Sequence, residues 1–152
     1  MPVDPDAARA LEIAPITVEV ERGRLRFFAK SIGETDPQYT DVEVARQHGH
    51  RDLPVPTTFF FSLDLERPDP FAYLDALGVD LRHVLHGEQH FDYHAMAYAG
   101  DTLTLESHVL DVTSKRGGSM DILRKRTDIR RGTELVATAT STIVVRYPQE
   151  ER

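Results

Sequence analysis

The residues best suited to acid–base chemistry lie in a polar turn at positions 33–41, between two predicted helices. The turn holds carboxylates and a phenol, at Glu34, Asp36, Tyr39 and Asp41. A proline-containing segment follows and leads to Thr57 and Thr58, where the free backbone amides of a helix start could polarise a carbonyl. Together these groups would suffice for proton transfer on a thioester. The alternative is that the carboxylates only cap helices, as they commonly do beside an Asp-Pro turn.

A second candidate is a strand at positions 86–94 that is rich in histidine and acid. Simple alternation places five of its side chains on one face: His86, Glu88, His90, Asp92 and His94. Imidazole and carboxylate ligands suit first-row metals, so a metal site is one interpretation, with His48 and His50 as weaker candidates. However, neighbouring side chains on one face are about 6.6 Å apart, so five cannot converge on one ion. The sequence therefore favours a solvent-facing or subunit-interface strand, and we predict no metal and no cofactor.

Composition excludes several chemistries and partners. The chain has no cysteine, which removes disulfides, thiolate catalysis and thiolate metal ligands. No serine lies in a Gly-x-Ser-x-Gly elbow, and Gly117-Gly118 joins two strands without the Lys-Ser/Thr of a phosphate loop. A net charge of −7, from 18 Lys+Arg and 25 Asp+Glu, argues against binding to nucleic acid or to an anionic membrane surface.

Hydropathy along the chain predicts a cytoplasmic protein. The N-terminal segment has no apolar core of signal-peptide length, and no stretch approaches the roughly 20 apolar residues of a membrane-spanning helix. A length of 152 residues fits one domain, 1–152. We expect an ordered core at about 15–147 and polar tails at about 1–10 and 148–152.

The first half of the chain contains residues that are typical of the starts and ends of short helices. After a strand at 15–20, apolar residues at 25, 28, 29 and 32 form one helical stripe that ends at Gly33. Thr40-x-x-Glu43 is a capping box for a second helix, which runs to Gly49. Residues 50–56 are extended because of their prolines. Thr57 or Thr58 then caps a helix through 59–63, and a short helix begins at Asp69-Pro70 and ends at Gly78.

The second half alternates as a sheet. Four strands are expected at about 82–94, 102–113, 119–131 and 134–146, joined as a meander. The last strand has small residues in the middle of one face, as a helix lying across a sheet requires. Because three adjacent phenylalanines, Phe59–Phe61, exceed one helical stripe, this run is expected to be core rather than the wall of a ligand pocket. The fold class is thus α+β, an antiparallel sheet wrapped around a long, buried helix.

Three stretches, in this order, carry a resemblance to a known family. They are 28–41 with 53–59, then 86–94 with Ala99-Gly100-Asp101-Thr102-Leu103, then 137–146. Over about residues 15–147 the chain resembles the N-terminal, non-catalytic-type half of MaoC-like dehydratases. The resemblance implies a hot-dog fold, an antiparallel β-sheet wrapped around a central α-helix, usually paired into dimers. It also implies hydration of enoyl thioesters, or dehydration of (R)-3-hydroxyacyl thioesters, of coenzyme A or acyl carrier protein.

Active members of that family carry Gly-Asp-x-Asn-Pro-x-His, in which Asp and His together activate or deliver water. In this chain Glu34 stands at the Asp position, Asp36 at the Asn position and Tyr39 at the His position. Thr57-Thr58 stands where His-Gly normally opens the central helix. Glu34 could still act as a base, although it is one methylene longer. A phenol is almost entirely protonated at neutral pH, so Tyr39 could donate a proton but is a poor base.

The candidate site follows from this resemblance. The catalytic candidates are Glu34 and Tyr39. The substrate-binding candidates are Asp36, Pro56, Thr57, Thr58 and Phe59.

Three hypotheses remain open from the sequence. The leading one is a hot-dog subunit of an (R)-3-hydroxyacyl thioester dehydratase or enoyl-CoA hydratase, a hydro-lyase of fatty acid metabolism. It would bind an acyl-CoA or acyl-carrier-protein thioester against the helix at 59–61. Its partner in a homodimer or heterodimer, a second hot-dog chain, would supply the catalytic Asp and His. The alternatives are a self-sufficient hydratase or thioesterase that uses Glu34, and a non-catalytic acyl-thioester binding protein.

Overall fold

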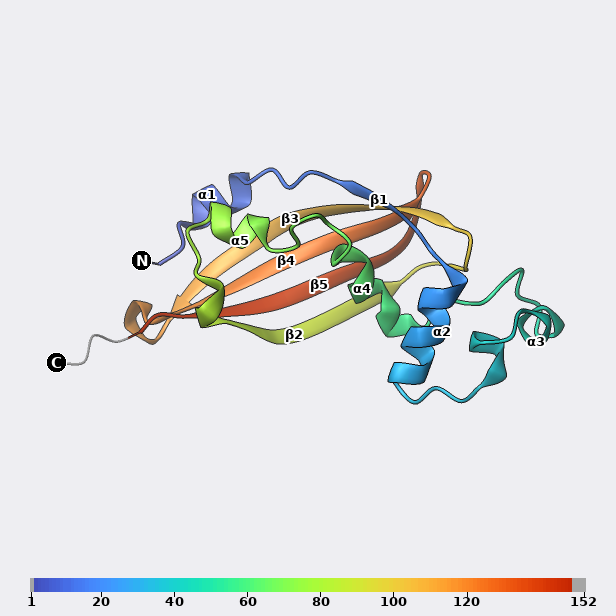
Figure 1. Ribbon diagram of the computed structural model, residues 1–152. Coiled ribbons are helices and arrows are strands. Elements are labelled where there is room, and N and C mark those ends of the chain that lie inside the picture. Colours follow the sequence, from blue (N-terminus) through green and yellow to red (C-terminus); the bar gives the residue numbers. More distant parts are fainter. Residues whose placement is uncertain (1, 149–152) are drawn as a thin grey trace.

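The computed structural model describes residues 2–148 and contains an antiparallel sheet of five strands (Figure 1). The strands are β1 (Ile16–Glu19), β2 (Val84–Tyr93), β3 (Thr102–Lys115), β4 (Met120–Arg131) and β5 (Glu134–Arg146). They lie in the order β1-β3-β4-β5-β2, so β2 forms one edge and the short β1 the other. The sheet with its helices confirms the predicted α+β class.

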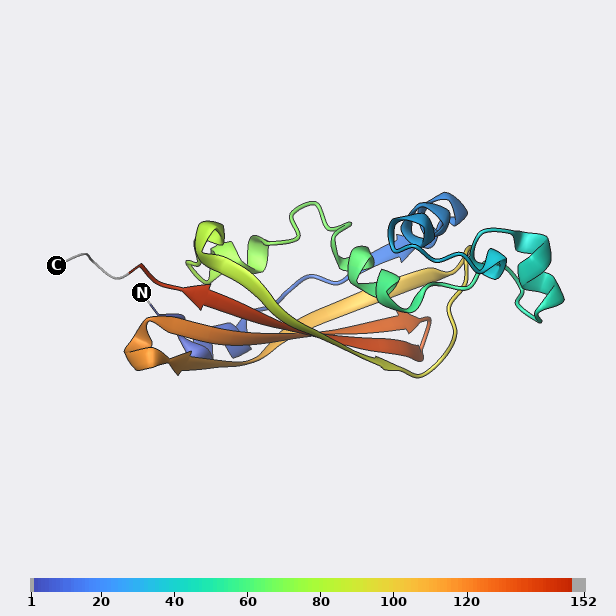
Figure 2. The same ribbon diagram turned by 90° about the horizontal axis from the view of Figure 1, so that it is seen from below.

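Short helices cover one face and one end of the sheet. They are α1 (Pro5–Ala10), α2 (Arg22–Ser31), α3 (Val42–Gln47), α4 (Phe60–Asp64) and α5 (Ala72–Ala76), with 3₁₀ helices η1 (Pro37–Tyr39), η2 (Thr57–Phe59), η3 (Leu81–His83) and η4 (Arg116–Gly118). Helices α4 and α5 lie over one face, here called the inner face, whereas α2 and α3 gather at the end opposite the two termini (Figures 1 and 2). Among residues 2–148, no helix is both long and apolar enough to span a membrane.

The predicted strands of the second half are confirmed to within two residues at each end, but the predicted meander is wrong in one place. Strand β2 pairs with β5, from Val84 opposite Val145 to Tyr93 opposite Ala137, and not with β3. The connection from β2 to β3 spans 94–101, too long for the tight turn that joins neighbouring strands. It crosses the end of the sheet instead and leaves β2 as an edge.

Local backbone geometry and hydrogen bonds determine where α2 ends and where α3 begins, on either side of the polar turn. Gly33 has a φ of 72°, the left-handed conformation predicted for the end of α2. Helix α3 is capped by Asp41, whose carboxylate accepts hydrogen bonds from the amides of Glu43 and Val44. The predicted capping box at Thr40 is therefore wrong by one residue, because the carboxylate that follows Thr40 reaches these amides.

The central helix is short, so the predicted long helix is wrong. Helix α4 has five residues and follows the 3₁₀ helix η2, whose start at Thr57 and Thr58 has no side-chain cap. Prolines at 54 and 56 precede it and prolines at 68 and 70 follow it, and proline opposes helical continuation on both sides. Asp69 does accept a hydrogen bond from the amide of Phe71, but regular helix α5 begins only at Ala72.

Two apolar clusters pack on the inner face. One surrounds Phe59 beneath α2 and α4, and the other joins α1 and α5 to the opposite end of the sheet. The second cluster includes Val3 and Ala8, which are 4% and 0% exposed. The predicted N-terminal polar tail is therefore wrong, and the packed region begins at Val3 rather than near residue 15. The predicted C-terminal tail lies, except for the exposed Pro148, outside the described residues.

Replacing Phe59 by alanine should lower the free energy of unfolding by about 3–5 kcal/mol, because it opens a cavity in closely packed core. Phe59 is 2% exposed, and its ring meets that of Phe28 edge-on at a centroid distance of 5.3 Å. Urea denaturation measures the loss. Phe27→Ala is the matched control on α2, where the side chain is 73% exposed and the change should stay within about 0.5 kcal/mol. Equal losses in the two variants would contradict this packing.

Candidate functional site

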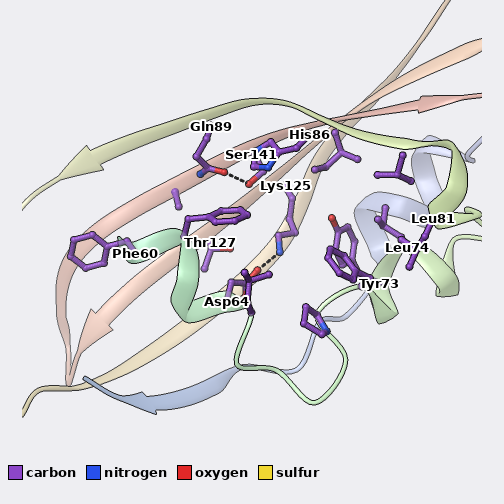
Figure 3. A pocket seen from close by; sticks show the side chains of 17 residues that line it. Phe60, Asp64, Tyr73, Leu74, Leu81, His86, Gln89, Lys125, Thr127 and Ser141 are labelled. Atoms are coloured by element: carbon purple, nitrogen blue, oxygen red, sulfur yellow. Dashed lines mark hydrogen bonds and ion pairs between the residues drawn. The ribbon is translucent and has the colours of Figure 1, made fainter. Parts of the chain in front are cut away.

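A cavity of about 370 Å³ lies between the inner face of the sheet and the chain from α4 to β2 (Figure 3). This volume is in the range of small-molecule binding sites. Its apolar lining residues are Phe60, Phe61, Leu65, Pro70, Phe71, Leu74, Leu81, Val84, Ala139 and Ile143. Its polar lining residues are Asp64, Tyr73, His86, Gln89, Lys125, Thr127 and Ser141.

The three adjacent phenylalanines divide between core and cavity. Phe59 points toward α2, where it packs against Phe28. Phe60 is 4% exposed and also lines the cavity, whereas Phe61 is half-buried with its ring centroid 5.1 Å from that of His86. The expectation that the whole run is core is therefore wrong for Phe61. Successive helical side chains point about 100° apart, so three in a row cannot share one environment.

A bulge at Gly87 places His86 on the inner face. His86 pairs with Ile143 and Glu88 with Thr142, so Gly87 is an extra residue in β2. A Cβ atom at Gly87 would lie 3.0 Å from Cγ2 of Val144, and glycine is the residue that fits without a shift. Because directly opposed residues share a face, His86 lies on the same side as the buried Ile143 and lines the cavity.

The same bulge overturns the predicted arrangement of the histidine-rich strand. Glu88, His90 and Asp92 pair with Thr142, Thr140 and Thr138, on the opposite face from the residues that line the cavity. One inserted residue reverses the alternation, so His86 does not share a face with these three residues, contrary to the prediction, and His94 lies beyond the end of β2. Over residues 2–148, no group of three or more His, Cys, Asp or Glu side chains could hold a metal ion.

A buried cluster of charges forms part of the cavity wall. Nζ of Lys125 on β4 pairs with the carboxylate of Asp64 on α4 (Figure 3), and Nε of Arg67 donates to the same carboxylate at 2.7 Å. The three side chains are 7%, 17% and 8% exposed, respectively. Burial alone would raise the pKa of Asp64, but the two cations hold it below its ordinary value. Asp64 is thus ionised, and two cations surround one anion.

Tyr73 of α5 adjoins this cluster. Nζ of Lys125 lies 4.7 Å from the centroid of its ring. The side chain is mostly buried and lines the cavity (Figure 3), and within residues 2–148 its hydroxyl makes no hydrogen bond. Burial, and secondarily the Asp64 carboxylate, raises the pKa of Tyr73 well above its ordinary value. The phenol therefore stays protonated and can donate a hydrogen bond.

The polar turn at 33–41 lies at the α2–α3 end of the molecule and contributes no side chain to the cavity wall (Figure 1). Oε1 of Glu34 accepts a hydrogen bond from the amide of Asp36 at 2.9 Å. Asp36 in turn caps η1 by accepting from the amide of Gln38 at 3.1 Å. Tyr39 is half-buried. The structure therefore brings Glu34, Asp36 and Tyr39 together in one turn, but not with the cavity of this chain.

The start of η2 also lies outside the cavity wall. Pro56 is buried, whereas Thr57 and Thr58 are exposed. As predicted, the amides of these two threonines are free, because they donate no hydrogen bond to any group of residues 2–148. The carbonyl of Thr57 accepts a hydrogen bond from the hydroxyl of Tyr93 at 2.8 Å. This contact places the free amides beside the edge strand β2.

The sequence analysis missed Lys125, Asp64 and Tyr73. Lys125 was detectable, because alternation along β4 puts it on the face of Leu123 and Ile129, which are both buried. A lysine in such a row is unusual, since charged side chains are rarely buried unless paired. Asp64 and Tyr73 carry no comparable signal, because their approach to β4 depends on how α4 and α5 pack across the sheet.

Comparison with known proteins identifies similar sequences. The model of the family described as "FAS1-like, dehydratase domain region" matches residues 7–139. A UPF0336 protein from Streptomyces griseus is 40% identical to this chain over 133 residues, which cover 87% of each protein.

Solved structures show the same fold. The HadBC (3R-hydroxyacyl-ACP dehydratase) complex from Mycobacterium tuberculosis is similar with a TM-score of 0.76 and 25% identity, over 88% of this chain and 93% of that one. A MaoC-like dehydratase is similar with a TM-score of 0.79 and 21% identity, over 93% of this chain and 43% of that one. These similarities confirm the predicted hot-dog fold.

Replacing Asp64 by asparagine should lower the free energy of unfolding by about 3–5 kcal/mol at neutral pH, because Lys125 and Arg67 would remain buried without their counter-charge. The folded-state pKa of Asp64 is depressed. Its stabilising contribution is therefore present above the unfolded-state pKa of about 3.9 and is lost as the pH falls through the lower folded-state value. The difference between wild type and variant should shrink below about pH 4, as urea denaturation across pH would show.

The control for this variant is Asp6→Asn, at a carboxylate that is 90% exposed beside Arg9. Its loss should be about 1 kcal/mol or less. A difference for Asp64→Asn that stays constant from pH 7 to pH 2 would contradict the assignment of an ionised, cation-paired Asp64.

Proposed function

Because this chain belongs to the FAS1-like dehydratase-region family and has the hot-dog fold of MaoC-like dehydratases, we propose that it is the acyl-binding subunit of an (R)-3-hydroxyacyl thioester dehydratase. In the reverse direction the same reaction is enoyl-thioester hydration. The chain acts as one hot-dog unit in the cytoplasm and binds a coenzyme A or carrier-protein thioester, and a second hot-dog chain supplies the catalytic Asp and His. The observation that carries this proposal is a cavity large enough for an acyl chain, whose wall contains none of the acid–base residues of the polar turn.

The cavity has the properties that an acyl chain requires. It is closed on one side by the sheet and on the other by Phe60, Phe61 and Leu74 from α4 and α5. Each methylene group transferred from water into such surroundings contributes about 0.8 kcal/mol. A chain of several carbons would therefore bind with useful affinity before any contact to the thioester is counted.

The substituted turn supports catalysis by a partner. Glu34 stands at the position of the family's Asp, but its carboxylate already accepts a hydrogen bond from Asp36 and lies outside the cavity wall. Tyr39 stands at the position of the family's His and is also outside that wall. An acid–base pair must reach the reacting carbons within hydrogen-bond distance. These positions favour acyl binding by this chain and catalysis by a partner chain over a self-sufficient enzyme that uses Glu34.

The edge strand β2 is the place where we expect the second chain to pair. An edge strand presents unpaired backbone N–H and C=O groups, which are a template for another strand. Leu85 and Tyr93, near the two ends of β2, are 53% and 46% exposed. The similar HadBC protein is a complex. Pairing along β2, in a homodimer or heterodimer, would bring the partner close to the free amides of Thr57 and Thr58.

In this proposal the steps of hydration are divided between the two chains. Hydration adds water to the double bond next to the thioester: the water oxygen bonds to C3, a base accepts its proton, and an acid delivers a proton to C2. Negative charge develops on the thioester oxygen, and the amides of Thr57 and Thr58 are the donors that this chain offers to it. The cavity holds the acyl chain in one orientation, so that C3 is held in the geometry in which water attacks it.

Hydration of 2-octenoyl-CoA, followed by loss of its conjugated absorbance, should be absent with this chain alone. It should appear when this chain is mixed with a hot-dog chain that carries Gly-Asp-x-Asn-Pro-x-His, at a rate above that of the partner alone. Turnover by this chain alone that is lost in Glu34→Gln would instead establish the self-sufficient enzyme. Thioester binding without turnover in any mixture would establish a binding protein.

Within the active mixture, Phe61→Lys should lower kcat/KM by about tenfold or more, because an unpaired ammonium group would face the apolar acyl chain. Phe27→Lys is the matched control, since Phe27 is 73% exposed and does not line the cavity. The same kinetic assay measures both variants. An equal effect of the two substitutions would remove the cavity from the proposal.

A further inference from the structure

The charged cluster beside the cavity has no role in binding a purely hydrocarbon chain. Alkyl groups need only apolar walls, and a buried cation is unfavourable unless an anion or hydrogen-bond acceptor compensates it. Lys125 nevertheless occupies a central position on the inner face, paired with Ser141 of β5 on one side and Val109 of β3 on the other. It lines the cavity with a side chain that is only 7% exposed.

The charges of the cluster formed by Asp64, Lys125 and Arg67 do not balance. Asp64 is the one acidic residue among the cavity-lining residues, and it is bound by both Lys125 and Arg67. Two cations and one carboxylate leave a net charge of +1 in largely buried surroundings. A ligand with one negative charge would neutralise this surplus.

The hydrogen-bond donors near the cluster point to the same kind of ligand. An ammonium group has three N–H donors, and the contacts of Lys125 within residues 2–148 are the Asp64 carboxylate and the face of Tyr73. The neighbouring polar groups already pair with each other: Ser141 donates to Gln89 at 2.6 Å, and the hydroxyls of Thr127 and Ser107 are 2.7 Å apart. His86 bonds through Nε2 to the carbonyl of Glu88 at 3.1 Å. Within residues 2–148, the cavity-lining donors that remain are the Lys125 ammonium group and the Tyr73 hydroxyl (Figure 3).

We propose that the cavity selects acyl thioesters whose chain carries a carboxylate remote from the thioester, and that Lys125 and Tyr73 bind this carboxylate. Its charge balances the cluster, and its two oxygens accept from an ammonium group and from a hydroxyl group. Asp64 does not repel the ligand, because Arg67 also neutralises it. The inference rests on the proposed function for the thioester, but the carboxylate site is a property of the cavity alone.

Two matched pairs of probes test the proposal with the full chain. The first pair is suberoyl-CoA and octanoyl-CoA, measured by isothermal titration calorimetry. The second pair is monomethyl suberate and methyl octanoate, which lack coenzyme A and are measured by ligand-detected NMR. The members of each pair have equal acyl length and differ in one terminal group. We expect the carboxylated member to bind about tenfold more tightly, a ratio that corresponds to about 1.4 kcal/mol.

Three variants assign the preference to residues. Lys125→Met removes the ammonium group and leaves Asp64 paired with Arg67, and the affinity ratio should fall to about one. Arg67→Met removes the same charge from the cluster at a side chain that does not line this cavity, so the ratio should fall only in part, because the surplus charge is lost but the Lys125 donor remains. Tyr73→Phe removes only the hydroxyl and should lower the ratio in part. Because each ratio is measured within one protein, a smaller folded fraction affects both probes equally.

The outcomes separate this inference from the proposed function. A preference for the carboxylated probes in the wild type that disappears in Lys125→Met and is reduced but still present in Arg67→Met supports the carboxylate site. Equal binding of the two members, a preference for the alkyl member, or no binding of any probe overturns it. A preference that survives in both Lys125→Met and Tyr73→Phe also overturns it. If the methyl esters show the preference but neither coenzyme A thioester binds, the carboxylate site stands and the proposed function fails.

Discussion

The inner face of the sheet is much longer than the helix available to cover it. Strand β5 has 13 residues and extends about 43 Å, whereas the five residues of α4 extend about 7.5 Å. Prolines on both sides keep this helix short. Helix α2 covers one flank with the cluster around Phe59, and α5 covers the other with the cluster that contains Leu74. The cavity is the part of the inner face between α4 and α5, where no helix packs directly on the strands.

The same charged side chains that connect the walls of this cavity also give it selectivity. Lys125 joins β4 to α4 through Asp64, and its ammonium group lies against the ring of Tyr73 on α5. Arg67 extends the connection by donating to the hydroxyl of Ser107 on β3 at 3.2 Å. Polar contacts of defined length hold the segments in one arrangement, whereas apolar contacts tolerate rearrangement. The cluster therefore holds the cavity wall in one arrangement and also places charge in it.

The cavity and the polar turn occupy different parts of this fold. The cavity lies under α4 and α5, whereas the turn with Glu34 and Tyr39 lies at the α2–α3 end of the molecule. In the proposed function acyl binding and catalysis belong to different subunits, so this chain would not need to keep an Asp–His pair. The edge strand β2 lies beside the exposed start of η2.

The long strands of the second half, the end of α2 at Gly33 and the substitution of the catalytic motif could all be predicted from the sequence, because alternation, turn residues and motif positions are local properties. It could also have identified Lys125 as inward-facing from its alternation with Leu123 and Ile129. It could not determine that His86 turns inward, because the single added residue Gly87 reverses the alternation. The cavity and its charged wall could not be predicted, because they form only when distant segments pack together. Lys125 and Asp64 are 61 residues apart in sequence, and their contact depends on how a short helix packs across a sheet.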